Sequence, residues 1–287
     1  MERKSKRILL FLLVLGLAVA LIGCSGSSEA PPPAREQGEQ SQAEGDANAG
    51  EVVDALDVIK EKGVLVAGLD DSFAPMGFRD ENNELVGFDI DMGEEIAKRM
   101  GIKIEWQPTD WDGVISALQT KRFDVIISGM TITEERAKQV NFTQPYVVAG
   151  VVALVRAGDD RVQTAEDLAG KVVGIQGGSS GEEVVKELEG LKEVKRYKQF
   201  PECLADLEIG RLDAAIVDVT VAAHFLALRP GVFEIATPLN EELFAIATRK
   251  EDTKLLDELN RIISEMKADG TLEQISMKWF GENVVPE

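Results

Sequence analysis

The sequence predicts an α/β fold of two lobes, each built on an open and mostly parallel sheet. Two observations support this prediction. Short apolar runs typical of strands alternate with amphipathic stripes typical of helices from about residue 52, and a second series of this kind begins after Arg161. The 287 residues, 44% hydrophobic and 29% charged, are enough for two globular domains. Ligands of such sheets bind beyond the carboxyl ends of the strands.

The first series contains strands, a hairpin and helices in turn. A polar turn at residues 80–83, flanked by apolar residues, predicts the hairpin. Apolar residues three or four positions apart predict helices at 92–100, which Gly101 ends, and at 111–118. Apolar or alternating runs predict strands at 64–67, 102–106 and 125–127.

The second series repeats this alternation, after a long β-prone run at residues 146–155. Its strands are predicted at 171–175, around Tyr197, at 214–217 and at 243–247. Its helices are predicted at 182–188, 202–209, 255–266 and 272–280. The helix at 255–266 has one continuous apolar face and ends at Gly270.

The charge and the rare residues exclude several classes of function. Acidic residues outnumber basic ones by 51 to 31, and a net charge of −20 repels the phosphates of nucleic acids. The single histidine, His224, makes a histidine metal site or a Ser-His-Asp triad improbable. With only Cys24 and Cys203, a disulfide framework is excluded.

Residues 1–23 form a separate segment that predicts export. A basic stretch at 2–7 precedes an apolar run at 8–22, which is short for a membrane span and suits a signal peptide. The run ends in Leu21-Ile22-Gly23-Cys24, which resembles the lipobox of bacterial lipoproteins, where the signal is cleaved before a cysteine that carries lipid such as palmitate. A plain anchor helix is the alternative. Cleavage would lower the net charge from −20 to −23, because four basic residues and one acidic residue leave.

Residues 24–51 predict a disordered tether between the lipid and the globular body. They are rich in Ser, Gly, Ala, Pro, Glu and Gln and lack apolar periodicity, so they cannot bury enough surface to fold. We therefore expect an exported protein, anchored through Cys24 to the outer face of the cell membrane or held in the periplasm.

Arg136 is the first candidate binding residue. It follows a predicted strand, and Thr133 is a natural N-cap, so Arg136 lies in the first turn of a helix. A cation there opposes the helix dipole. Its presence makes sense if the guanidinium binds a carboxylate. The alternative is a solvated arginine that pairs with Glu134 or Glu135.

A glycine-rich turn at residues 177–181 is the second candidate. It follows a predicted strand, and Ser180 with Glu183 matches a capping box at the start of a helix. Free N–H groups there suit an anion, and the nearby carboxylates favour a single carboxylate over a polyphosphate. An ordinary βα turn is the alternative.

Further candidates follow predicted strands. Asp218 ends a strand, where it suits an ammonium group or serves as an N-cap. Phe73 and Trp111 follow predicted strands. We expect them either to contact a ligand from both sides or to pack in the core. We expect His224 to be structural or solvated and Cys203 to be a small buried residue, with a reactive thiol as the minor alternative.

The order of the motifs resembles that of the bacterial extracellular solute-binding proteins of family 3, the polar amino-acid receptors of ABC importers. The resemblance covers about residues 52–283. It is carried by Asp70-Asp71-Ser72-Phe73-Ala74-Pro75, by the runs at 85–91, 108–113, 129–136, 174–180 and 213–218, and by the ending at 268–281.

This resemblance implies a type II clamshell with two mixed sheets flanked by helices. The first lobe would comprise residues 52–146 and 244–287, and the second lobe residues 150–240. Crossovers at 146–150 and 240–244 would act as hinges.

The resemblance also implies roles for the site residues. Arg136 would bind the ligand α-carboxylate, assisted by the N–H groups of Thr131 and Ser180. Asp218 would bind the α-ammonium together with the Gly129 carbonyl. The same motifs place six more residues at the site: Phe73 and Trp111 as walls, Asp70 as a reader of the ligand side chain, Gln176 where some glutamine receptors have lysine, and Met130 and Ser179.

The leading hypothesis is a monomeric, non-enzymatic receptor that presents a free L-amino acid to a membrane permease, without a cofactor, metal ion or catalytic residue. A periplasmic enzyme of the same fold, such as a dehydratase or a lytic transglycosylase, and a partner of a membrane kinase are alternatives. Because Asp70 is left to face the ligand side chain and Gln176 is neutral, arginine or lysine is expected ahead of glutamine. Asp70 accepting from a glutamine amide, or Asp71 pointing inward, are the alternatives.

Overall fold

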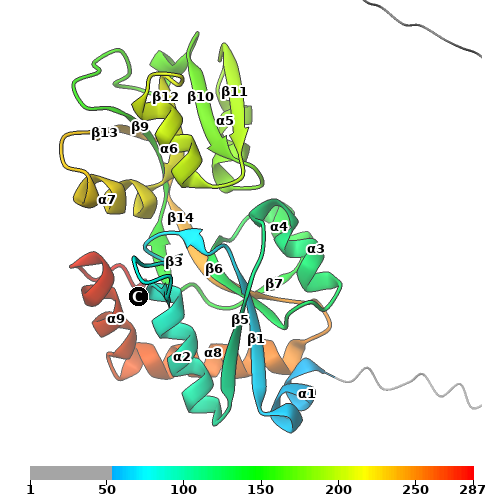
Figure 1. Cartoon of the computed structure of the whole chain (residues 1–287). Coiled ribbons are helices and arrows are strands. Elements are labelled where there is room, and N and C mark those ends of the chain that lie inside the picture. Colours follow the sequence, from blue (N-terminus) through cyan, green and yellow to red (C-terminus); the bar gives the residue numbers. More distant parts are fainter. Residues whose placement is uncertain (1–53) are drawn as a thin grey trace, which may run out of the picture. The chain divides into compact units, whose positions relative to one another are not determined.

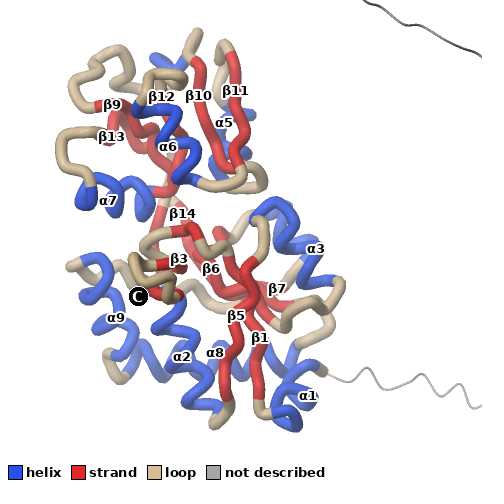
Figure 2. The backbone as a smooth tube through the Cα atoms, viewed as in Figure 1, coloured by secondary structure: helices blue, strands red, loops and turns tan. Residues whose placement is uncertain are grey.

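The computed structural model describes residues 54–287, which carry two large open sheets flanked by helices (Figures 1 and 2). The predicted signal peptide, the lipidation of Cys24 and the whole of the predicted tether lie outside the described residues. Within 54–287, no helix is both long and apolar enough to span a bilayer.

The first sheet has six strands, in the order β5-β1-β6-β14-β7, with β8 also paired to β14. β1 pairs in parallel with β5 and β6, whereas β14 is antiparallel to β6, β7 and β8. The strands are β1 (Val64–Leu69), β5 (Lys103–Pro108), β6 (Val125–Thr131), β7 (Asn141–Phe142), β8 (Val147–Ala149) and β14 (Glu242–Thr248).

The second sheet has five strands, in the order β11-β10-β12-β9-β13. β10 pairs in parallel with β11 and β12, whereas β9 is antiparallel to both β12 and β13. The strands are β9 (Val151–Arg156), β10 (Val172–Gln176), β11 (Glu193–Tyr197), β12 (Ala214–Asp218) and β13 (Phe233–Pro238). Both sheets are therefore mixed, as the family resemblance implied.

Helices cover both sheets, and a small sheet of short strands forms the predicted hairpin region. Around the first sheet lie α1 (Ala55–Lys62), α2 (Phe88–Met100), η1 (Trp111–Gly113), α3 (Val114–Gln119), α4 (Glu134–Gln139), α8 (Thr253–Ala268) and α9 (Thr271–Phe280). With the second sheet lie η2 (Glu166–Leu168), α5 (Ser180–Glu187), α6 (Phe200–Glu208) and α7 (Val219–Leu228). The small sheet is β2 (Ser72–Phe73), β3 (Gly77–Arg79) and β4 (Leu85–Val86).

The structure has helices where the sequence predicted them from apolar residues that recur on one face. α2 ends at Gly101, which adopts a left-handed conformation and donates its N–H to the carbonyl of Ala97, as predicted. In α8 the apolar face is fully buried, with Leu259, Ile262 and Met266 on it. The sequence patterns did not predict α1, β7 or β13. β13 lacks a strict alternation of buried and exposed residues, which explains why periodicity does not identify it.

The chain passes between the two sheets twice, between β8 and β9 and between β13 and β14. These crossovers lie side by side, because the Val151 N–H donates to Asn240 Oδ1 at 2.7 Å. A Cβ atom on Gly150 would clash with the Asn240 carbonyl, so glycine allows this close approach. We call the part around the first sheet the first lobe and the part around the second sheet the second lobe. The limits of the lobes and the hinge motion remain predictions.

Candidate ligand site

A narrow cavity of about 10 Å³ lies between the two lobes. Its walls come from the carboxyl ends of parallel strands β1, β6, β10 and β12 and the loops that follow them, which is where open α/β sheets bind ligands. The lining residues are Asp70, Phe73, Trp111, Gly129, Thr131, Arg136, Gln176, Ser179, Ser180, Phe200 and Asp218. The structure thus brings together ten of the eleven residues that the sequence nominated.

Met130 is the exception. Its side chain is buried on the other side of β6, in an apolar cluster with Val114 and Leu118. Successive residues of a strand point to opposite faces, so Met130 lies behind the cavity that Gly129 and Thr131 line.

Arg136 points into the cavity from α4, and only 6% of it is exposed. Thr133 caps α4 as predicted, since its Oγ1 accepts the Arg136 N–H at 3.2 Å. The guanidinium donates through Nη1 to the Thr131 carbonyl and through Nη2 to the Gly178 carbonyl, both at 2.9 Å. The alternative of a solvated surface arginine is therefore wrong. Burial lowers the pKa of Arg136, while Glu183, Asp218 and Glu242 raise it.

The glycine-rich turn brings the start of α5 to the cavity, but its capping differs from the prediction. Ser179, not Ser180, occupies the N-cap position, and no side chain caps this helix. The Ser179 hydroxyl instead donates to the Gln176 carbonyl at 2.8 Å. Ser180 is the first helical residue, and its hydroxyl donates to Glu242 at 2.9 Å. The predicted capping box is wrong because a tertiary acceptor binds the Ser180 hydroxyl.

Asp218 ends β12 and is 6% exposed. It stands at the N-cap position of α7 but makes no side-chain capping bond, so the N-cap alternative does not describe its carboxylate. Burial, and next the charge of Glu242, raise the pKa of Asp218 to about 8, against the opposing effect of Arg136. A buried carboxylate of this kind suits a cationic partner.

Asp70 and Gln176 meet across the two lobes. Gln176 Nε2 donates to Asp70 Oδ2 at 2.6 Å, and Ser72 donates its N–H and its hydroxyl to Asp70 Oδ1. Burial raises the pKa of Asp70. Asp71 pairs with Arg79 at 2.7 Å on the partly exposed side of the hairpin, so the alternative that Asp71 points inward is wrong.

Aromatic rings form the apolar walls. The Phe73 ring from the first lobe lies 5.8 Å from that of Phe200 in the second lobe, measured between centroids. Trp111 Nε1 donates to the Gly178 carbonyl at 3.1 Å, and the Trp111 ring lies 5.6 Å from the Arg136 guanidinium carbon. Sequence reasoning missed Phe200, although its place at the start of a helix after a strand was a usable signal.

Two buried residues outside the lining set fix Gly129. Asp89 Oδ2 accepts the Gly129 N–H at 2.8 Å, and the Tyr146 hydroxyl donates to Asp89 Oδ1 at 2.7 Å. Burial raises the pKa of Asp89 to about 7. Gly129 has φ +49°, and a Cβ atom there would clash with the Phe73 ring. The sequence motif included Asp89 without assigning it this role.

The remaining candidates lie away from the cavity. His224 packs against Phe78 with 5.4 Å between ring centroids, in agreement with a structural role. Cys203 is buried, and burial raises the pKa of its thiol to about 12, so the thiol is unreactive at neutral pH. Among residues 54–287, no group of His, Cys, Asp and Glu side chains is arranged to hold a metal ion.

The cavity thus joins one buried cation and two buried carboxylates with aromatic walls. Comparison with known proteins agrees with this architecture. The family model described as bacterial extracellular solute-binding proteins, family 3, matches residues 65–282. The L-cystine-binding protein TcyJ of Escherichia coli (strain K12) is 35% identical over 231 residues, which cover 80% of this chain and 87% of TcyJ.

Solved structures show the same fold at higher identity. The P235GK mutant of ArgBP from T. maritima matches with a TM-score of 0.76 and 44% identity, over 79% of this chain and 100% of that chain. An ancestral arginine-binding protein bound to arginine matches with a TM-score of 0.74 and 45% identity, over 76% of this chain and 99% of that chain. An ancestral arginine-binding protein bound to glutamine matches with a TM-score of 0.73 and 45% identity, over 77% of this chain and 99% of that chain.

Proposed function

Because the chain belongs to the bacterial extracellular solute-binding proteins of family 3, we propose that it is an amino-acid-binding protein of an ABC importer. Its ligand is a cationic L-amino acid, arginine or lysine, bound between the lobes and delivered to a membrane permease. The observation that carries this proposal is the burial of Arg136, Asp218 and Asp70 around one small cavity.

Arg136 and Asp218 have the charges that a free amino acid requires. A guanidinium binds a carboxylate through two parallel hydrogen bonds, and a buried carboxylate binds an ammonium group. The N–H groups of Thr131 and Ser180 assist at the ligand carboxylate, and the carbonyl of Gly129 assists at the ammonium. In this proposal the Arg136 contacts to the Thr131 and Gly178 carbonyls hold the guanidinium in place for its ligand.

Asp70 gives the preference for a cationic side chain. Its donors, Ser72 and Gln176, are neutral, so they satisfy hydrogen bonds and leave the negative charge without a cation. A ligand guanidinium or ammonium would supply the missing charge. Phe73 and Trp111 add apolar faces, on which a guanidinium gains roughly 0.5–2 kcal/mol of cation–π attraction.

Glutamine is the second candidate ligand. The Gln176 amide already donates to Asp70, which indicates that the Asp70 carboxylate accepts an uncharged amide without rearrangement. The structures of ancestral arginine-binding proteins, one bound to arginine and one to glutamine, support keeping this candidate.

We also propose how the protein is placed in the cell. The sequence supports cleavage before Cys24 and lipid attachment there, which would hold a monomeric receptor on the outer face of the membrane, beside the permease.

Calorimetric titration of the purified chain against arginine, lysine, histidine, glutamine and cystine tests the function. We expect arginine and lysine to bind most tightly and to be recovered unaltered after incubation. Tighter binding of glutamine or cystine would refute the cationic preference and leave the receptor assignment standing. A chemically changed ligand would instead indicate an enzyme.

A further inference from the structure

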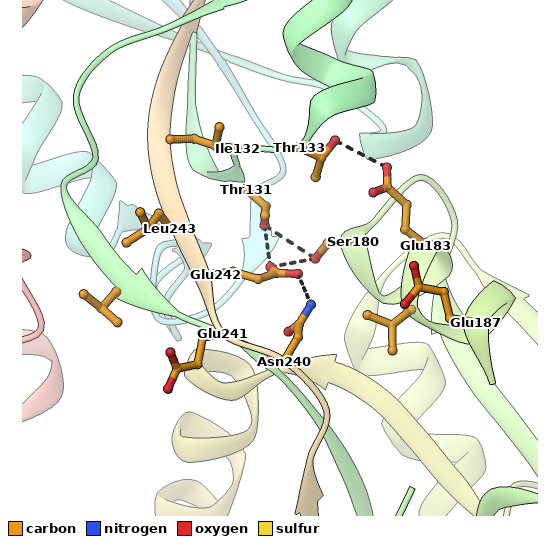
Figure 3. A pocket seen from close by; sticks show the side chains of 12 residues that line it. Thr131, Ile132, Thr133, Ser180, Glu183, Glu187, Asn240, Glu241, Glu242 and Leu243 are labelled. Atoms are coloured by element: carbon orange, nitrogen blue, oxygen red, sulfur yellow. Dashed lines mark hydrogen bonds between the residues drawn. The ribbon is translucent and has the colours of Figure 1, made fainter. Parts of the chain in front are cut away.

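Glu242 is a buried carboxylate at the point where the second crossover enters β14. It is 8% exposed, whereas its neighbour Glu241 is exposed. Figure 3 shows the Glu242 side chain between Thr131 and Ser180, with Asn240 beside it. A second cavity, larger than the ligand site, lies against these residues.

Three hydrogen bonds converge on this carboxylate. Thr131 donates its hydroxyl to Glu242 Oε2 at 2.7 Å, and Ser180 donates its hydroxyl to the same oxygen at 2.9 Å. Asn240 Nδ2 donates to Oε1 at 3.0 Å, while Asn240 Oδ1 accepts the Val151 N–H of the other crossover. Glu242 therefore links the first lobe, the second lobe and both crossovers.

These partners are neutral donors, so the burial of the Glu242 charge is not offset by a hydrogen-bonded cation. Burying a carboxylate in this way is costly for stability. This arrangement is suited to positioning the donor side chains and not to stabilising the fold through an ion pair. Thr131 and Ser180 are also the residues whose N–H groups, in the proposed function, bind the ligand carboxylate.

We propose that Glu242 is a latch for the closed form. By accepting the Ser180 hydroxyl across the lobes while it holds Thr131, it positions both N–H groups of the carboxylate subsite and slows opening of the loaded site. Opening the lobes breaks the bond between Ser180 and Glu242, so the latch adds to the lifetime of the bound complex. This inference rests on the proposed function for its ligand, but the latch itself does not depend on which amino acid binds.

Glu242→Ala in the full chain tests the latch, with Glu241→Ala as the matched control. Both variants remove one carboxylate from neighbouring positions, but only Glu242 accepts the Ser180 hydroxyl. Arginine is the probe, and its release is followed by stopped-flow tryptophan fluorescence, to which Trp111 contributes because its indole N–H contacts the second lobe. We expect release to be about 10- to 100-fold faster in Glu242→Ala and within about twofold of the parent in Glu241→Ala.

A second variant keeps the test valid if Glu242→Ala does not fold. Ser180→Ala removes only the donor across the lobes, so it should also speed release, and the double variant should be no worse than Glu242→Ala. Equal release rates in Ser180→Ala, Glu242→Ala and Glu241→Ala would overturn the latch.

Measuring the distance between the lobes distinguishes a failure of the latch from a failure of the proposed ligand assignment. Spin labels at K98C and K186C, both exposed positions, in a C24S background report that distance with and without arginine. We expect longer distances in Glu242→Ala than in Glu241→Ala. If the parent chain does not bind arginine, the ligand assignment fails, and the distances still decide the latch: identical distributions in the two variants would refute it.

Discussion

Arg136 lies in the six-residue helix α4, and its side chain is buried and directed at the cavity. Its hydrogen bonds go to two carbonyls, which position the guanidinium but do not neutralise it. A buried guanidinium that hydrogen-bonds only to carbonyls lacks a carboxylate partner, and we expect the ligand to supply that carboxylate.

Arg136→Ala should therefore weaken amino-acid binding by two to four orders of magnitude. Removing one partner of a buried charge pair costs about 3–5 kcal/mol, and each ~1.4 kcal/mol is a factor of ten in affinity. Titration calorimetry measures the change, with Lys138→Ala on the exposed face of the same helix as the control. A loss below tenfold would mean that Arg136 does not bind the carboxylate.

The raised pKa of Asp218 predicts that the affinity for the ligand depends on pH. With its pKa raised to about 8, the carboxyl holds a proton at neutral pH in the ligand-free chain. A ligand ammonium favours the ionised form, so binding releases the proton and affinity rises up to ~10-fold per pH unit until about pH 8. For folding the sign is opposite: the raised pKa stabilises the chain most below pH 3.8, and this contribution is lost as the pH rises toward 8.

Calorimetry at pH 6, 7 and 8, in buffers of different ionisation enthalpy, counts the protons released on binding. Asp218→Asn should abolish the release and most of the binding. If ligand binding at pH 7 takes up protons, or exchanges no protons with the buffer, then Asp218 is not protonated in the ligand-free site.

At the scale of elements, β6 is central to the site, because Gly129 and Thr131 lie on it and Arg136 follows it. The sequence predicted this strand, the cap at Thr133 and the helices with a clear apolar stripe. The predicted cap at Ser180 was wrong, because the Ser180 hydroxyl donates to Glu242, 62 residues away. The roles of Asp89, Phe200 and Glu242 also depend on contacts between distant elements, which local spacing does not encode.

Gly129→Ala tests how β6 shapes the site. The substitution places a Cβ atom against the Phe73 ring at a positive φ, which costs about 1–3 kcal/mol of unfolding free energy. Gly113→Ala is the control, since a Cβ atom there meets nothing within 4 Å. Urea denaturation measures both. Similar stabilities for the two variants would show that β6 tolerates a side chain at position 129.

At the scale of the whole molecule, the two lobes contact each other through residues that line the cavity. Arg136 and Trp111 reach the Gly178 carbonyl, and Gln176 reaches Asp70. The contacts that line the cavity are thus also contacts that hold the lobes together. We predict from this arrangement that ligand binding is coupled to closure of the lobes. The order of the motifs predicted the two-lobed fold and ten of the residues that line the cavity. The contacts of Glu242 and the support of Gly129 by Asp89 were visible only in the folded structure.

A crystal structure of the chain grown with arginine tests the central claim most directly. We predict one arginine molecule in the cavity, its carboxylate on Arg136 and its α-ammonium on Asp218, with the guanidinium toward Asp70 and the rings of Phe73 and Trp111. An empty cavity at saturating arginine, or arginine bound elsewhere with Arg136 still confined to the Thr131 and Gly178 carbonyls, would contradict it.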